Sequence, residues 1–166
     1  MKRSSSVAAA LAAALLLGAA ANAGSQTSAP TLTFLDATSQ GTQHFLDNAP
    51  KSPTANPRSK RFRLSIGDEL YTLSPILDGK TGKRIGTSYS QFTVVSGNSF
   101  EKAWFKGHGV FQLHDGQLVV DGIFKAASTT NTVAVVGGTG AYKGARGSMT
   151  FTETTNGSQD IIHLLP

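Results

Sequence analysis

Apolar and polar residues alternate in short segments over most of this chain, and turn residues separate the segments. Such alternation is typical of strands that bury one face. Beyond residue 23, no window shows the apolar spacing of about 3.6 residues that marks an amphipathic helix. About eight strands at this spacing predict an all-β domain, either a closed antiparallel barrel or a sandwich. The predicted strands are TLTFLDAT (31–38), RFRLSI (61–66), ELYTLSPIL (69–77), RIGTSYSQFTVV (84–95), AWFKGHGVFQLH (103–114), QLVVDGIFKA (117–126), NTVAVV (131–136), SMTFTETT (148–155) and QDIIHLL (159–165).

The dipeptide Asp115-Gly116 is a strong hairpin signal between two of these strands. If the two residues form the whole loop, Leu113 faces Leu118 and Phe111 faces Val120. All four apolar side chains then lie on one face of the hairpin, which supports the assignment of faces.

A second hairpin signal, Asn156-Gly157, has a less favourable consequence. A two-residue loop there places Glu153 directly opposite Asp160, and like charges in that position destabilise a sheet. Three explanations remain open. The loop is longer, the pair lies at the wet rim of the sheet, or both carboxyls point into a cavity and share a proton, which would raise one pKa.

The segment Val133–Gly147, VAVVGGTGAYKGARG, is ambiguous by itself. An apolar run entering a glycine-rich turn is also found in dinucleotide-binding folds. That interpretation requires a helix after the glycines, whereas the residues after Gly147 are β-branched and rich in turn formers. The glycines are therefore predicted to turn the chain between two strands.

The first 23 residues have the three parts of a secretory signal: Lys2 and Arg3, an uncharged Ala/Leu-rich stretch, and the small-x-small site at residues 21–23. Cleavage after Ala23 predicts a secreted or periplasmic protein with no stable membrane span. A retained anchor is the alternative, although the stretch is short for a span. Residues 24–30 read as a flexible leader, and residues 31–166 as one β-barrel domain.

The prolines at 50, 53 and 57 predict a mobile surface loop over residues 48–59. The chain contains no cysteine, so an apolar core must hold it together without disulfides. The net charge of +5 includes Lys2 and Arg3 of the signal.

Three segments in order resemble the allene oxide cyclase and dirigent-like barrel family: GDELYTLSPILDGKTGKRIGTS (67–88), FKGHGVFQLHDGQLVVDGIF (105–124) and VAVVGGTGAYKGARGSMTF (133–151). The resemblance implies a single closed antiparallel barrel of about eight strands, often assembled as a homotrimer. It also implies a cavity that holds a small apolar or phenolic molecule without cofactor or metal. The implied activity is that of a cyclase or isomerase, or of a guide that steers the coupling of a reactive intermediate.

Arg146 matches the arginine of the family's A-R-G motif, which lies near the pocket. The chain departs from the family at Ala141, where dirigent proteins often carry Asp. Asp36 is the acid in the strand that corresponds to the cyclase's first strand, although the surrounding cyclase pattern is absent. Arg146 could instead pair with an acid, and Asp68, the third candidate catalytic residue, could be a turn residue.

Tyr142, Phe111 and Phe151 are the candidate ligand-binding residues, with packing on the glycine turn as the alternative for Tyr142. The four histidines are dispersed and have no metal-ligand spacing. The basic run 58–63 is short and interrupted by Phe62, so a nucleic-acid partner is not predicted. The predicted function is a secreted small-molecule-binding barrel, and the alternative is a non-catalytic structural or adhesive module with a packed core.

Overall fold

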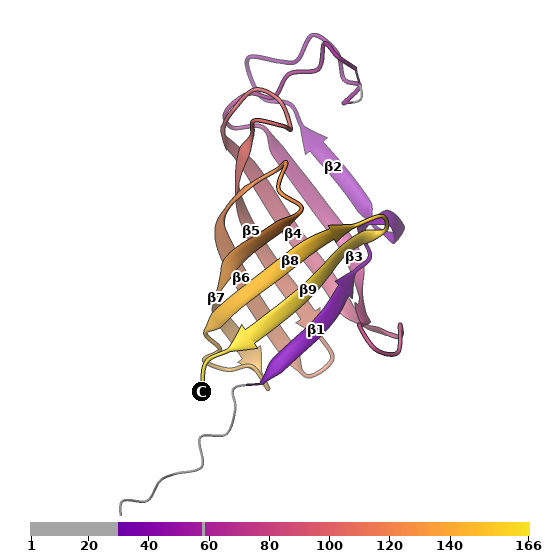
Figure 1. The fold of residues 1–166 in the computed structure, drawn as a ribbon, viewed down its shortest axis with the longest axis vertical. Helices are drawn as coiled ribbons and strands as arrows, with labels where there is room; N and C mark the ends of the chain where they lie inside the picture. The colour runs from indigo at the N-terminus through magenta and orange to yellow at the C-terminus, as the bar shows by residue number, and fades with distance from the viewer. Residues whose placement is uncertain (1–29, 58) are drawn as a thin grey trace, which may run out of the picture.

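The computed structural model describes residues 30–57 and 59–166, which form one antiparallel barrel (Figure 1). Eight strands close it in the order β1-β9-β8-β7-β6-β5-β4-β3, and β3 pairs back with β1. This confirms the predicted closed antiparallel barrel of about eight strands. The predicted signal peptide and nearly all of the leader lie outside the described residues. The strands are β1 (Thr31–Asp36), β2 (Thr42–Leu46), β3 (Glu69–Asp78), β4 (Arg84–Ser96), β5 (Trp104–Leu113), β6 (Gly116–Lys125), β7 (Thr130–Gly140), β8 (Gly147–Thr154) and β9 (Gly157–Leu164).

β2 is a ninth strand that the sequence pattern did not predict. The chain leaves β1 through a short 3₁₀ helix, η1 (Thr38–Gln40), and β2 then continues along the other half of β3. Conversely, residues 61–66, which were predicted to be a strand, belong to no strand. Phe62 and Leu64 do alternate with exposed arginines, but they bury themselves against the end of the barrel rather than in a ladder.

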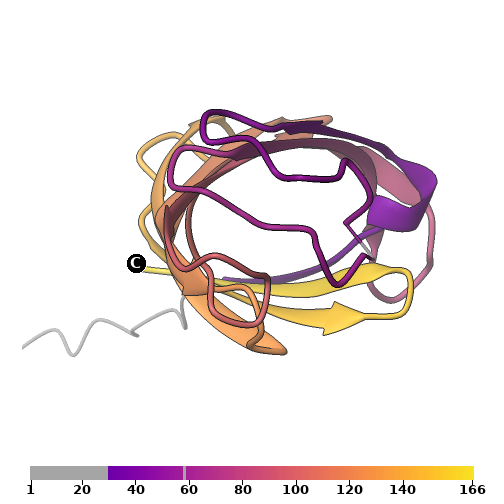
Figure 2. The same ribbon diagram turned by 90° about the horizontal axis from the view of Figure 1, so that it is seen from above.

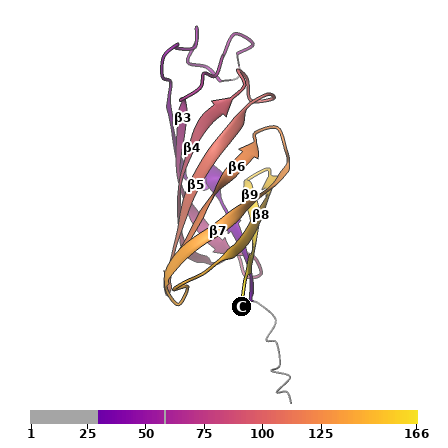
Figure 3. The same cartoon turned by 90° about the vertical axis from the view of Figure 1, so that its left-hand side faces the viewer.

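The segment between β2 and β3 runs across one end of the barrel, as the view from above shows (Figure 2). Its Phe62 and Leu64 pack with Val94, Ala103 and Phe105 in a small core cluster at that end. The proline-rich stretch predicted as a mobile surface loop is therefore the first part of a cap on the barrel. β1 begins and β9 ends at the opposite end of the barrel, where the C-terminus lies (Figure 3).

Both hairpin turns lie one residue earlier than predicted. Phe111 pairs with Leu118, and Phe151 pairs with Asp160, so the loops are residues 114–115 and 155–156. In each case the glycine of the Asp-Gly or Asn-Gly dipeptide begins the second strand of the hairpin instead of lying in the loop. Glycine is also favoured at this last position of a turn. The predicted faces are nevertheless correct, because a shift of the partner by two residues keeps each side chain on its side of the sheet.

β7 continues through Gly137, Gly138 and Gly140, so the turn to β8 lies over residues 141–146, later than the glycines predicted, and no helix follows it. Gly147 has a φ of +153°, and a Cβ at this position would collide with the carbonyl oxygen of His163 on β9. The last glycine of the A-R-G motif thus allows β8 and β9 to approach. The nucleotide-binding interpretation is excluded by this strand-turn-strand arrangement. Among the described residues, no helix is long and apolar enough to cross a membrane.

A larger core cluster fills the barrel on the side of the chain ends. Its fully buried members include Ile76, Leu118 and Ile162. Between this cluster and the cap the interior is not filled, and that space contains the candidate site.

Candidate functional site

A cavity of about 430 Å³ occupies the middle of the barrel, and members of both core clusters line it. Small-molecule sites in proteins typically measure about 300–1,000 Å³. The cavity is therefore large enough for a ligand of two or three fused rings. It is formed by the inward faces of the strands, which alternate with outward-facing residues as the sequence predicts.

Glycines on β5 create part of this space. Gly107 and Gly109 take inward positions between the buried Phe105 and Phe111. A Cβ on Gly107 would lie 2.9 Å from the Phe124 ring, so this glycine makes room for phenylalanine rings of the cavity wall. A Cβ on Gly109 would meet the Val120 and Ser90 side chains at 3.0 and 3.3 Å. The sequence GHG in the middle of a long strand thus leaves two inward positions without a side chain.

Phenylalanine rings form the apolar wall. Phe124 makes edge-to-face contacts with Phe92 and Phe151, with ring centroids 5.6 and 5.2 Å apart. Phe105 stacks on Phe124 and connects it through Phe100 to Phe62 in the cap. A continuous row of rings therefore leads from the cap to the cavity.

Three carboxylates also line the cavity: Asp36 on β1, Glu153 on β8 and Asp160 on β9. Ser158 stands between them, because it pairs with Asp36 on one side and with Glu153 on the other. The Ser158 hydroxyl donates to Asp160 at 2.8 Å, and the Ser74 hydroxyl donates to Asp36. Glu153 is exposed, so it marks the place where the cavity opens to solvent, whereas Asp36 and Asp160 are buried.

Burial changes the protonation of these groups. It raises the pKa of Asp160 to about 7; the Ser158 hydrogen bond opposes the rise, and the nearby Asp36 and Glu153 carboxylates add to it. Burial also raises the pKa of Asp36, against hydrogen bonds from Ser74 and Ser88 that lower it. At Glu153 desolvation, and then the charge of Asp36, raise the pKa. Near neutral pH the cluster therefore contains a carboxyl that can both give and take a proton.

Among the described residues, no three histidine, aspartate or glutamate side chains are arranged so that they could hold a metal ion.

Comparison with known proteins supports the fold but not one activity. No family model and no curated protein matches the sequence. Among solved structures, a pyocyanin demethylase aligns with a TM-score of 0.63 at 17% identity, over 82% of this chain and 100% of that one. A pterocarpan synthase dirigent protein aligns at 0.54 and 18%, over 82% and 94%. The Diels–Alderase AbmU from Streptomyces koyangensis aligns at 0.53 and 14%, over 85% and 72%.

The fold is the dirigent-like barrel. The predicted resemblance is confirmed in this respect, while its allene oxide cyclase part remains a prediction. At such low identities the likeness concerns the fold alone, and the site of this dirigent-like barrel has to be interpreted from its own residues.

Arg146, the residue singled out by the motif, does not reach the cavity of the dirigent-like barrel. Its side chain is exposed, and its guanidinium donates to the carbonyl oxygen of the adjacent Ala145 at 2.7 Å. It makes no ion pair with Asp68 or Asp121; Asp121 lies beside His108. The catalytic role predicted for Arg146 therefore has no geometric support, because strand alternation places it on the side away from Met149.

Asp68 is fully buried but lies at the base of the cap, outside the cavity. Its carboxylate accepts hydrogen bonds from the backbone of Asn48 and from both the backbone and the hydroxyl of Ser65. This is the turn role that was the alternative to catalysis.

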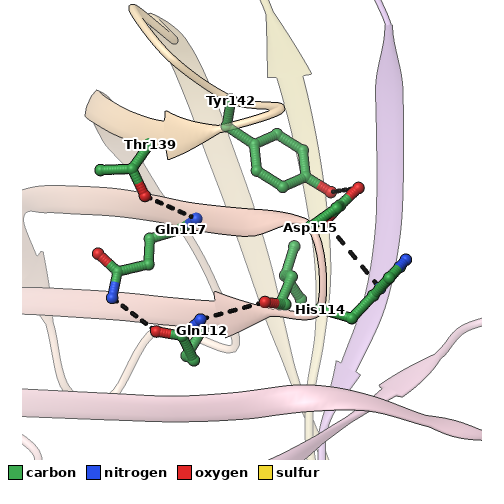
Figure 4. A network of polar contacts seen from close by, with 7 residues as sticks. Gln112, His114, Asp115, Gln117, Thr139 and Tyr142 are labelled. Carbon is green, nitrogen blue, oxygen red and sulfur yellow. Dashed lines mark hydrogen bonds and ion pairs between the residues drawn. The ribbon is translucent and has the colours of Figure 1, made fainter.

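Tyr142 also lies outside the cavity, at the turn between β5 and β6 (Figure 4). Its hydroxyl donates to Asp115 at 3.4 Å, and burial raises its pKa to about 12. The ring packs against Gly116 of the β5–β6 turn, whereas the predicted alternative was packing on the glycine turn. Two neighbouring contacts complete this surface network: the Gln117 backbone donates to Thr139, and the Gln117 amide donates to Gln112.

Of the six predicted site residues, the structure brings three to the cavity: Asp36, Phe111 and Phe151. Glu153 and Asp160 were recognised in the sequence only as an unfavourable charge pair. In the structure Glu153 pairs with Ser158 and Asp160 pairs with Phe151, so the predicted register was wrong and the two carboxyls are not directly opposed. Both nevertheless line the cavity, as the third explanation required. The like charges, spaced for one inward face, were the signal that could have identified the site.

Proposed function

We propose that this protein is an exported dirigent-like barrel that binds a small, largely apolar oxygenated molecule. It acts there as a cyclase or isomerase, or as a guide for a reactive intermediate, without a cofactor. The single observation that carries the proposal is the cluster of Asp36, Glu153 and Asp160, two of them buried, on the wall of a largely apolar cavity. Groups with shifted pKa values in a cavity are typical of functional sites.

The proteins of similar fold support this choice of class. They include a pterocarpan synthase dirigent protein, a Diels–Alderase and a cyclase that catalyses a [4 + 2] cycloaddition. In each of these a barrel of this fold is associated with the chemistry of a small organic molecule.

The chemistry proposed for the cavity has two parts. The phenylalanine wall holds the apolar body of the substrate in one conformation, which favours one ring closure over others. Asp160, whose pKa is raised by burial to about 7, donates its proton to a substrate oxygen as electron density moves there. Asp36, held by Ser74, accepts a proton from the substrate or stabilises developing positive charge.

A ligand screen tests the proposal. Apolar oxygenated compounds, phenols and polyketide fragments are added to the protein, and unfolding is followed. A ligand present at 100 times its Kd should add about 2.7 kcal/mol of stability. Gly109→Val should abolish this gain, because its side chain grows into the cavity past groups that can move.

Gly137→Val is the matched control, since a Cβ on this β7 glycine meets only the Arg146 guanidinium, at 3.8 Å, and the residue does not line the cavity. It should keep the stabilisation by ligand. If no compound stabilises the unmodified protein, or if Gly109→Val responds like Gly137→Val, the barrel is not a binding barrel of this kind. The rival interpretation as a structural or adhesive module would then be preferred.

Export is tested separately on the expressed full chain. The protein recovered outside the cytoplasm should begin at Gly24, the residue after the predicted cleavage site. Edman sequencing or mass spectrometry of the N-terminus measures this directly. An intact N-terminus on a protein that stays in the cytoplasm would contradict the proposed localisation.

A further inference from the structure

In the part of the chain that the structure describes, the cavity is lined by acidic side chains without basic partners of the lysine or arginine type. Among the described residues that line it there are three carboxylates and no lysine or arginine. His108 also borders it, but its imidazole lies 3.4 Å from Asp121, and both side chains are well exposed. The buried acids receive hydrogen bonds only from serine hydroxyls, at Asp36 and Asp160.

A buried carboxylate without a cationic partner is costly when ionised, because hydroxyl hydrogen bonds replace only part of its hydration. The protein supplies no such partner for Asp36 or Asp160. A bound molecule can supply it, and a ligand with a positive charge would then gain the interaction that the empty cavity lacks. An anionic ligand would add a fourth negative charge to the same space.

The aromatic wall favours the same kind of ligand. Phe151 pairs directly with Asp160 across β8 and β9, and both residues line the cavity. The ring of Phe124 lies at right angles to that of Phe151. Aromatic faces attract organic cations, and the attraction is strongest where the cation is desolvated. A carboxylate beside phenylalanine rings thus provides both parts of a site for a flat cation.

The charge at the opening of the cavity is also negative. Glu153 is exposed at the opening, while Asp160 and Asp36 lie deeper. A negatively charged opening with low-dielectric walls raises the local concentration of cations and lowers that of anions.

We infer that the cavity selects a flat, apolar organic molecule that carries one positive charge, such as an N-alkylated heteroaromatic cation or a protonated aromatic amine. This inference rests on the proposed function and specifies its substrate class. An arginine in the cavity would instead have favoured a ligand with a negatively charged end, but Arg146 lies outside the cavity.

Three probes of similar size and different charge test the inference on the same protein: 1-methylquinolinium, quinoline and 2-naphthoate, at about pH 8, where quinoline is neutral and the naphthoate is ionised. Binding is measured by calorimetry. The cation should bind about tenfold more tightly than quinoline, a difference of about 1.4 kcal/mol, and the naphthoate should bind most weakly.

Two variants identify the source of the preference. In Asp160→Asn the ratio of quinoline Kd to cation Kd should fall severalfold toward one, with quinoline binding kept. Glu153→Gln, which changes only an exposed side chain, should reduce the ratio in the same direction. Asp121→Asn, on the outer face, should leave it unchanged.

Equal affinities for the cation and quinoline, or tighter binding of the naphthoate, would overturn the inference. So would a cation preference that survives in both cavity variants, or the failure of all three probes to bind. None of these results decides the proposed function, which stands or falls with the wider ligand screen and its Gly109→Val comparison.

Discussion

Asp160→Asn is expected to make the protein more stable by about 2 to 4 kcal/mol above pH 7. The folded protein holds the pKa of Asp160 at about 7, against an ordinary value of 3.8. Ionising this carboxyl is therefore less favourable in the folded protein than in the unfolded chain, and this difference lowers the stability. The asparagine amide has no charge to desolvate, and its oxygen can still accept the hydrogen bond from Ser158.

The sign of the pH dependence follows from the direction of the shift. Because the folded pKa is higher than the unfolded one, the stability linked to Asp160 is complete below about pH 4. It is lost as the pH rises to about 7 and stays lost above that value. The variant should therefore gain most over the unmodified protein at alkaline pH and least below pH 4.

Denaturant unfolding at about pH 4 and about pH 8 measures this effect. Asp121→Asn serves as the control, since its side chain is on the partly exposed outer face, and it should show no comparable gain at pH 8. An Asp160→Asn variant that is less stable than the parent at pH 8 would show that the ionised carboxylate is held favourably. The buried acid would then be structural, whereas the expected gain marks a residue kept at a cost to stability.

Asp68→Ala is expected to destabilise the protein by about 3 kcal/mol or more. The carboxylate is completely buried and accepts three hydrogen bonds, at 2.7 to 2.9 Å, from Asn48 and Ser65. Its removal leaves these donors without their acceptor in a place that water does not reach. It also releases the two ends of the cap that covers one end of the barrel.

Chemical denaturation measures the loss, and limited proteolysis should locate new cleavage sites within residues 48–67. Asp47→Ala is the matched control in the same segment, because Asp47 accepts only longer bonds from the Ser52 backbone, at 3.1 and 3.2 Å. It should cost about 1 kcal/mol or less. Equal losses for the two variants would mean that Asp68 does not anchor the cap.

Most of the barrel could be predicted from the sequence because strand periodicity is a local property. Phe111 and Leu118 were assigned to the inner face correctly, even though the hairpin loop was placed one residue late. A wrong partner two residues away leaves the face unchanged, so faces are more robust than registers. The same tolerance does not extend to irregular segments, as β2 and the cap show.

The cap was missed because its pattern has two structural solutions. Phe62 and Leu64 alternate with arginines as they would in a strand, but they pack on the end of the barrel. Such a segment can pair with a free strand edge or pack on an open barrel end. Which of the two it does depends on how the other strands close the barrel. The predicted surface loop and the predicted strand 61–66 together cover the barrel end, and Phe62 of the latter joins the row of rings that leads to the cavity.

By itself, the sequence determined the all-β class, the inward faces of most strands, and the turn at the A-R-G motif. These depend on residues close together in the chain. Only the tertiary structure decided that Gly107 and Gly109 leave a cavity, because an interior is filled or empty according to side chains from many strands. It also decided that Asp160 lines the cavity while Arg146 does not. The pKa of Asp160 depends on burial and on carboxylates that β1 and β8 bring beside it, and no local pattern contains that information.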